Sequence, residues 1–301
     1  ISDEITVIRR GTTVGSVNPK TQTVSEQDLA VMMVGSELPT PETRGDTIRD
    51  EVILDVANLT VLASGGKAIV DDISFKIRAG EILGIAGVEG NGQAEILDAL
   101  MGLATASGVV KFAGEDISKK STRHRRELGI GFIPEDRQRQ ALLLTAPLWE
   151  NRMLGYQTVA PNSKGFLLTP KLAKTDTERI VKEYDVRTPS IDVNASALSG
   201  GNQQKLIVGR EMSGKPRLLI AAHPTRGIDV GAQAAIWDHL RDARDAGLAV
   251  LLISADLDEL IGLSDSIKVL LRGKFVADAN PATVSPEELG TAMTGARKAS
   301  A

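Results

Sequence analysis

The sequence contains no cysteine and no apolar run that approaches the roughly 20 residues needed to cross a bilayer. The first absence excludes a disulfide framework, a thiol catalyst and a cysteine metal site. The second, with the lack of a recognisable signal peptide, indicates that any role at a membrane depends on a partner. The formal net charge of -4 does not indicate a basic, nucleic-acid-binding surface, so we expect no nucleic-acid partner.

The composition is that of an ordinary globular protein, with 42 % hydrophobic and 25 % charged residues in a chain of 301. Apolar runs followed by polar loops alternate with helical patterns, which predicts a mostly parallel α/β sheet. These segments are 82–94, 127–140, 218–232 and 249–260. Because ligands bind beyond the carboxyl ends of parallel strands, we expect a site built from these loops.

An internal repeat joins the two ends of the chain. The matching segments are Ile1–Gly11 with Leu263–Gly273, Val17–Pro19 with Ala279–Pro281, and Val24–Gly35 with Val284–Gly295. Each copy predicts a strand, an Arg-Gly turn, a second strand and a short helix capped by Ser25 or Ser285. We interpret residues 1–38 as the tail of a preceding, homologous domain, which fits a chain that begins with Ile1. A small duplication within one domain is the alternative.

The other predicted boundaries follow from composition. Residues 39–50 form a linker that lacks any apolar period, the domain proper covers 51–295, and 296–301 are a short tail. Within the domain, the stretches 51–62 and 67–77 alternate like strands.

A glycine-rich loop lies between an apolar strand and a helical run, which is the setting of a phosphate-binding P-loop. Its residues are Gly87, Val88, Glu89, Gly90, Asn91, Gly92, Gln93 and Ala94. A working P-loop also needs a lysine for the phosphate charge and a hydroxyl for Mg²⁺. Gln93 and Ala94 stand at those two positions. Phosphate binding through the backbone alone would be weaker, and such turns also occur without phosphate.

The stretch LSGGNQQ, Leu198–Gln204, precedes a helix-forming run. Ser199 can cap that helix, the glycines allow close approach, and the helix N-terminus attracts phosphate. A Ser-Gly-Gly turn is ordinarily just a helix start, but the whole string resembles the signature motif of ATP-binding-cassette (ABC) ATPases. In that family the signature binds ATP held on another cassette. The resemblance implies that role for Ser199, Gly200, Gly201 and Gln203.

The resemblance extends over nearly the whole chain and also identifies what is replaced. The family's Asp-Glu pair corresponds to Ala222 and His223, its switch histidine to Ala255, and its glutamine after the FIP strand to Glu135. A lone histidine such as His223 is more often structural than catalytic. The PTRGID turn with Asp229 resembles the family's D-loop. We therefore expect no catalytic residue and no metal ligand of this chain's own, and a signature lent to a partner cassette.

The family implies a fold and partners. The fold is α/β, a P-loop NTPase of ABC type with a mostly parallel core, an antiparallel β subdomain and a helical signature subdomain at about 136–212. The segments quoted above, with EYDVRTP, are similar to the second cassette of the tandem ATPase subunit of bacterial simple-sugar and nucleoside importers. In that family the second P-loop ends in Gln, so Gln93 looks native. EYDVRTP favours the nucleoside branch.

Several further expectations follow from this resemblance. They are a preceding cassette in the same polypeptide, transmembrane permease subunits docked near Glu135, and an extracytoplasmic binding protein. ATP and Mg²⁺ would occupy a composite site in the full-length protein, at the cytoplasmic face of the bacterial membrane. Two alternatives of other classes are a non-transport ABC protein and a nucleotide-binding regulatory domain.

Overall fold

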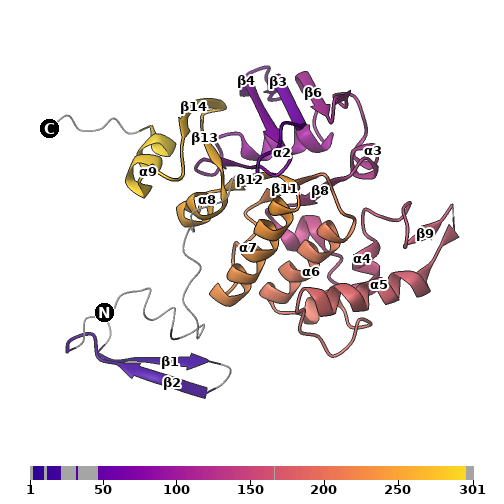
Figure 1. Cartoon of the computed structure of the whole chain (residues 1–301), viewed down its shortest axis with the longest axis vertical. Coiled ribbons are helices and arrows are strands. Elements are labelled where there is room, and N and C mark those ends of the chain that lie inside the picture. The colour runs from indigo at the N-terminus through magenta and orange to yellow at the C-terminus, as the bar shows by residue number, and fades with distance from the viewer. Residues whose placement is uncertain (1–2, 10–11, 22–31, 33–46, 166, 296–301) are drawn as a thin grey trace.

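The computed structural model describes residues 3–9, 12–21, 32, 47–165 and 167–295. Ser25, the 296–301 tail and most of the predicted linker lie outside these ranges. A six-stranded sheet forms the centre, in the order β14-β13-β5-β12-β11-β8 (Figure 1). Its strands are β5 (Ile82–Ala86), β8 (Ile130–Ile133), β11 (Leu218–Ala222), β12 (Ala249–Ser254), β13 (Ser266–Leu271) and β14 (Lys274–Ala279).

Neighbouring strands of this sheet run parallel, except that β14 is antiparallel to β13. Every residue of β5, β11 and β12 is buried, as expected for continuous apolar runs covered on both faces. The prediction of a mostly parallel α/β sheet is therefore confirmed.

A second, antiparallel sheet has the order β4-β3-β6-β7. Its strands are β3 (Val52–Leu62), β4 (Ala68–Arg78), β6 (Ser107–Phe112) and β7 (Glu115–Asp116). Helix α2 (Gln93–Met101) buries Ile96 and Leu100 in the same apolar cluster as Val56 and Phe75 of this sheet. The alternating pattern of 51–62 and 67–77 thus marks two paired strands with one face on the core.

The other face of the central sheet packs against helices. These are α6 (Gly200–Ser213), α7 (Val230–Asp245), α8 (Leu257–Leu263) and α9 (Pro286–Thr294). Figure 1 shows α6 and α7 on the side of the sheet away from β3 and β4. The remaining helices are α3 (Thr122–Glu127), α4 (Leu148–Met153) and α5 (Pro170–Glu183), with a π-helical turn η1 (Arg137–Ala141) and a 3₁₀ turn η2 (Ala195–Ala197).

The stretch 141–194 is helical with loops, as predicted, but it also contains a short hairpin of β9 (Ser163–Lys164) and β10 (Leu167–Leu168). Strands of two residues are too short to produce an alternating pattern that can be read in the sequence.

A buried carboxylate joins α6 to the central sheet and to the helical region. The Glu211 side chain has no exposed surface and accepts hydrogen bonds from Arg126, Arg210, Tyr156 and the Phe132 N–H. Complete burial by itself raises the pKa of Glu211. The two guanidinium groups and the two other donors nevertheless hold that pKa below its usual value. This network fixes α6, and hence the turn before it, to β8.

The hairpin part of the internal repeat, with the turn that follows it, is also a structural repeat. The hairpin of β1 (Ile5–Arg9) and β2 (Thr12–Val17) has a bulge between Val7 and Ile8, and β13–β14 has one at the matching place. After each hairpin an asparagine side chain accepts a backbone N–H two residues on, at 2.9 Å for both Asn18 and Asn280. In the second copy Ser285 caps α9 in a capping box, as predicted.

Candidate functional site

The polar loops after β5, β8, β11 and β12 lie at one edge of the central sheet, because the four strands are parallel neighbours. This confirms the expectation that the topology brings these loops together. The edge therefore carries the glycine-rich loop, Glu135, His223 and Ala255.

The glycine-rich loop connects β5 to α2 and is filled by one of its own side chains. Gln93 is 8 % exposed and folds back into the loop. Its Oε1 accepts the Asn91 N–H at 3.0 Å, and its Nε2 donates to the Val88 carbonyl at 2.9 Å. Nε2 lies only 2.5 Å from where a Cβ on Gly87 would be, so a side chain at this position would displace the Gln93 amide. A backbone N–H of the kind that cradles phosphate is thus already satisfied internally.

The surroundings of the loop lack two kinds of group that could contact Mg²⁺-bound ATP. Ala94 is exposed and offers a metal no oxygen. The start of β4 lies next to Gly92 of the loop. The β3–β4 turn before it, 63–67, contains no aromatic ring on which a nucleobase could stack. Within the ranges described above, no group of three or more His, Cys, Asp or Glu side chains could hold a metal ion.

The end of β11 carries no carboxylate. Ala222 is buried, and His223 turns the chain with a left-handed φ of 46°. Its N–H donates to the Ile253 carbonyl at 2.8 Å. Burial lowers the pKa of His223, and nearby Arg226 lowers it further against the opposite effect of neighbouring carboxylates. The backbone hydrogen bond and the lowered imidazole pKa agree with a structural role for this histidine.

An ion-pair network that the sequence analysis missed crosses this edge. Arg226 Nη1 contacts Glu89 Oε1 of the glycine-rich loop at 2.6 Å and also contacts the carboxylate of Glu135. The network links three loops of the sheet edge. Opposite charges in the loops after three apolar strands were the available signal, but only the strand order shows that these charges meet.

The LSGGNQQ stretch forms the turn that starts α6. Ser199 is exposed and caps the helix, as predicted, accepting from the Asn202 N–H at 3.5 Å and from its Nδ2 at 3.0 Å. Gly201 is packed so closely that an added Cβ would lie 3.2 Å from the Ala232 Cβ. Gln203 is 3 % exposed and donates to the Ala195 carbonyl at 3.1 Å. It therefore lies behind the turn and away from its exposed side.

The start of α7 lies against the same turn. Asp229 caps α7, accepting the Ala232 N–H at 3.0 Å, and its Oδ2 lies 3.3 Å from the position of a Cβ on Gly201. Two helices of 14 and 16 residues thus begin side by side. Their N-terminal dipole ends favour an anion at this place.

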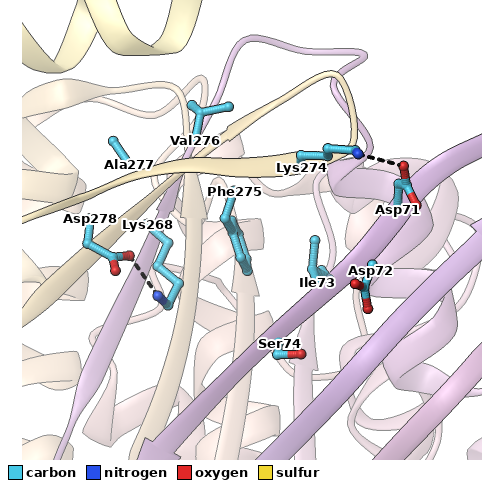
Figure 2. A pocket seen from close by; sticks show the side chains of 10 residues that line it. All are labelled: Asp71, Asp72, Ile73, Ser74, Lys268, Lys274, Phe275, Val276, Ala277 and Asp278. Atoms are coloured by element: carbon cyan, nitrogen blue, oxygen red, sulfur yellow. Dashed lines mark hydrogen bonds and ion pairs between the residues drawn. The ribbon is translucent and has the colours of Figure 1, made fainter.

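A hollow elsewhere on the surface lies between β4 and β14 (Figure 2). It contains none of the predicted site residues. Its lysines face carboxylates of the same hollow, Lys274 with Asp71 at 2.9 Å and Lys268 with Asp278 at 2.6 Å. The hollow therefore has no surplus positive charge for a phosphate.

The fold is that of a nucleotide-binding cassette of the P-loop class. Three features define it: a parallel sheet with a glycine-rich strand-to-helix loop, an antiparallel sheet beside it, and a helical insert before a Ser-Gly-Gly helix start. The family profile described as ABC transporter matches residues 70–226. The chain belongs to the ABC transporter family, as an ATPase domain. ATP binding with Mg²⁺ is general for such domains.

The chain is similar to ATP-binding proteins of importers. It is 41 % identical to the guanosine import ATP-binding protein of Bacillus subtilis (strain 168), over 98 % of this chain and 58 % of the relative. It is 40 % identical to the nucleoside import ATP-binding protein of Lactococcus lactis subsp. cremoris, with the same coverage. A ribose import ATP-binding protein of Streptomyces coelicolor is 36 % identical, over 92 % of this chain and 52 % of the relative. The chain thus spans just over half the length of these relatives.

Solved structures show the same fold. An ABC transporter cassette in its ADP conformation matches with a TM-score of 0.65 at 22 % identity, over 81 % of this chain and 95 % of that one. A dimeric cassette bound to ADP and phosphate matches with a TM-score of 0.66 at 17 % identity, over 76 % and 99 %. These similarities confirm the predicted ABC-type fold. Among the helices described, none is long and apolar enough to span a membrane.

Proposed function

We propose that this chain is the second ATP-binding cassette of the tandem ATPase subunit of an importer for a nucleoside or a simple sugar. The names of the relatives in B. subtilis, L. lactis and S. coelicolor support the substrate class. The matching bulges and asparagine turns of the two hairpins support a preceding cassette, of which residues 1–38 are the tail.

The cassette divides into two parts with different roles. Its cis site is the loop 87–94 with Ala222 and His223, and it lacks the cation, hydroxyl and carboxylates that ATP hydrolysis needs. Its trans surface is the signature turn Ser199–Gly201 with the turn 226–229. This surface offers two helix starts to a nucleotide held by the preceding cassette. Gln203 supports the signature turn from behind.

The observation that carries this proposal is the Gln93 side chain, which fills the cis loop while Ser199 remains exposed on the trans surface. ATP and Mg²⁺ would occupy the composite site between the preceding cassette's P-loop and this trans surface. The role of this chain's own residues there is to contact and orient the phosphate.

The further partners follow from the importer assignment. Permease subunits in the membrane would dock near Glu135 and the helical region, and an extracytoplasmic binding protein would deliver the substrate. The subunit would lie at the cytoplasmic face of the membrane. Co-purification of the full-length protein with a polytopic membrane protein tests this assignment, and consistent absence of one would favour a non-transport ABC protein.

Ser199→Arg in the full-length protein tests the trans role, because a long cation would block the exposed helix start. We expect most ATP hydrolysis to be lost. Ser196→Arg, at an exposed serine just before the signature, is the matched control and should retain activity. The isolated 301-residue chain should hydrolyse little ATP. Full activity in Ser199→Arg, or robust turnover by the isolated chain, contradicts the proposal.

A further inference from the structure

We propose that Arg137 is a positioning residue that locks the two turns of the trans surface into one unit. This inference rests on the proposed function, because it concerns how the signature turn and the turn 226–229 are presented to a partner's nucleotide. Arg137 belongs to neither turn. It opens η1, the π-helical turn that follows β8.

The backbone fixes where the Arg137 side chain starts. Asp136 caps η1, its carboxylate accepting the Gln138 and Arg139 N–H groups at 3.1 Å each. The guanidinium then extends to the turn 226–229. Its Nη1 donates to the Arg226 carbonyl at 2.7 Å and its Nη2 to the Gly227 carbonyl at 3.2 Å. The planar guanidinium group thus binds two successive backbone carbonyls, which lie 89 and 90 residues after Arg137 in the sequence.

The same guanidinium lies against the signature turn. A Cβ on Gly200 would come within 2.6 Å of Arg137 Nη2 and within 3.3 Å of the Gly227 carbonyl oxygen. Real Cβ atoms do not approach other atoms as closely as 2.6 Å, so the absent side chain at Gly200 is what admits the arginine. Arg137 therefore fills the junction between the two turns. Gly201 and Asp229 form a second contact between the same two turns.

This contact explains how the trans surface stays in one geometry. Hydrolysis at a nucleotide site is faster when the donors that contact the phosphate are already held in place, because no reorganisation accompanies the reaction step. Glu135 supports the same turn through the Arg226 side chain, while Arg137 holds its backbone. A lysine could supply a charge here, but it could not span two carbonyls in a fixed plane.

The test uses the full-length tandem protein and three variants: Arg137→Lys, Arg137→Gln and, as matched control, Arg139→Lys on the exposed side of the same turn. Steady-state ATP hydrolysis gives kcat and KM. Two further measurements are made on each variant: the affinity for a non-hydrolysable ATP analogue and the thermal unfolding temperature. Ser199→Arg serves as reference for the trans role itself.

We expect Arg137→Lys and Arg137→Gln each to lower kcat by about tenfold or more, because the two turns are then no longer held in the geometry that contacts the phosphate in the transition state. Analogue binding and the unfolding temperature should stay close to the wild-type values, as should all properties of Arg139→Lys. Rescue by lysine would mean that charge alone suffices and would overturn the inference. A loss of kcat that follows a lowered unfolding temperature would overturn it as well.

The outcomes also separate this inference from the proposed function. If Ser199→Arg abolishes hydrolysis while both Arg137 variants remain fully active, the trans surface works without Arg137 and only this inference fails. If Ser199→Arg remains active, the trans role fails, and the role of Arg137 in it fails too.

Discussion

The side chain of Gln93 occupies its own phosphate loop, so its removal is expected to tighten phosphate binding there. In the wild-type chain a phosphate that uses the Asn91 N–H must first displace Gln93 Oε1 from 3.0 Å. It must also disturb the 2.9 Å bond from Nε2 to the Val88 carbonyl. Gln93→Ala removes both competing bonds and leaves the backbone of the loop unchanged in sequence.

The size of the effect follows from these two bonds. An intramolecular hydrogen bond contributes about 0.5–1.5 kcal/mol net, so two contribute about 1–3 kcal/mol. Since about 1.4 kcal/mol corresponds to a factor of ten, ADP and inorganic phosphate should bind Gln93→Ala roughly 5- to 150-fold more tightly than the wild type. Binding should not depend on Mg²⁺, because neither Ala94 nor Ala222 can coordinate it.

Calorimetric titration of the 301-residue chain with ADP and with inorganic phosphate, with and without Mg²⁺, measures this. Gln93→Glu keeps an acceptor for the Asn91 N–H but adds a negative charge, so it should bind more weakly than the wild type. Gln138→Ala, at an exposed glutamine outside the loop, should change nothing. Equal or weaker binding by Gln93→Ala, or tight Mg²⁺-dependent binding by the wild type, would refute the reasoning.

Two further predictions concern buried carboxylates. Glu211→Gln should lower the free energy of unfolding by about 3–5 kcal/mol, because it leaves buried arginines uncompensated. The control Glu183→Gln, at an exposed ion pair, should lower it by only about 0–1 kcal/mol. Denaturant unfolding measures both values, and equal losses would contradict the prediction. Burial, with a smaller effect of Asp256, raises the pKa of Glu259 despite hydrogen bonds from Thr225 and Trp237. Its stabilising contribution is therefore complete below the unfolded-state pKa and lost as pH rises through the folded-state pKa. The unfolding temperature of the wild type should fall relative to that of Glu259→Gln over this window, and parallel pH profiles would contradict this.

Much of the fold could be predicted because it depends on local patterns. Continuous apolar runs marked β5, β11 and β12, and alternation marked β3 and β4. The short hairpin β9–β10 could not be predicted, because two-residue strands have no period. The place of Gln203 in the signature string predicts contact with a nucleotide. Its hydrogen bond to the Ala195 carbonyl could not be predicted, because the direction of a side chain on a helix depends on what packs around it.

The sequence by itself determined the longer apolar and alternating strands, the glycine-rich loop and the Ser199 cap. It also determined that Gln93, Ala94, Ala222 and His223 stand where the resemblance expects a lysine, a hydroxyl and two carboxylates. These features depend on residue type and short-range spacing, because such residues restrict the local conformation of the backbone to few possibilities. Only the tertiary structure decided that Gln93 folds into its own loop, that Arg226 joins two glutamates, and that Arg137 holds a turn 89 residues away. Such contacts depend on strand order and packing, because parallel strands bring together loops that lie far apart along the chain.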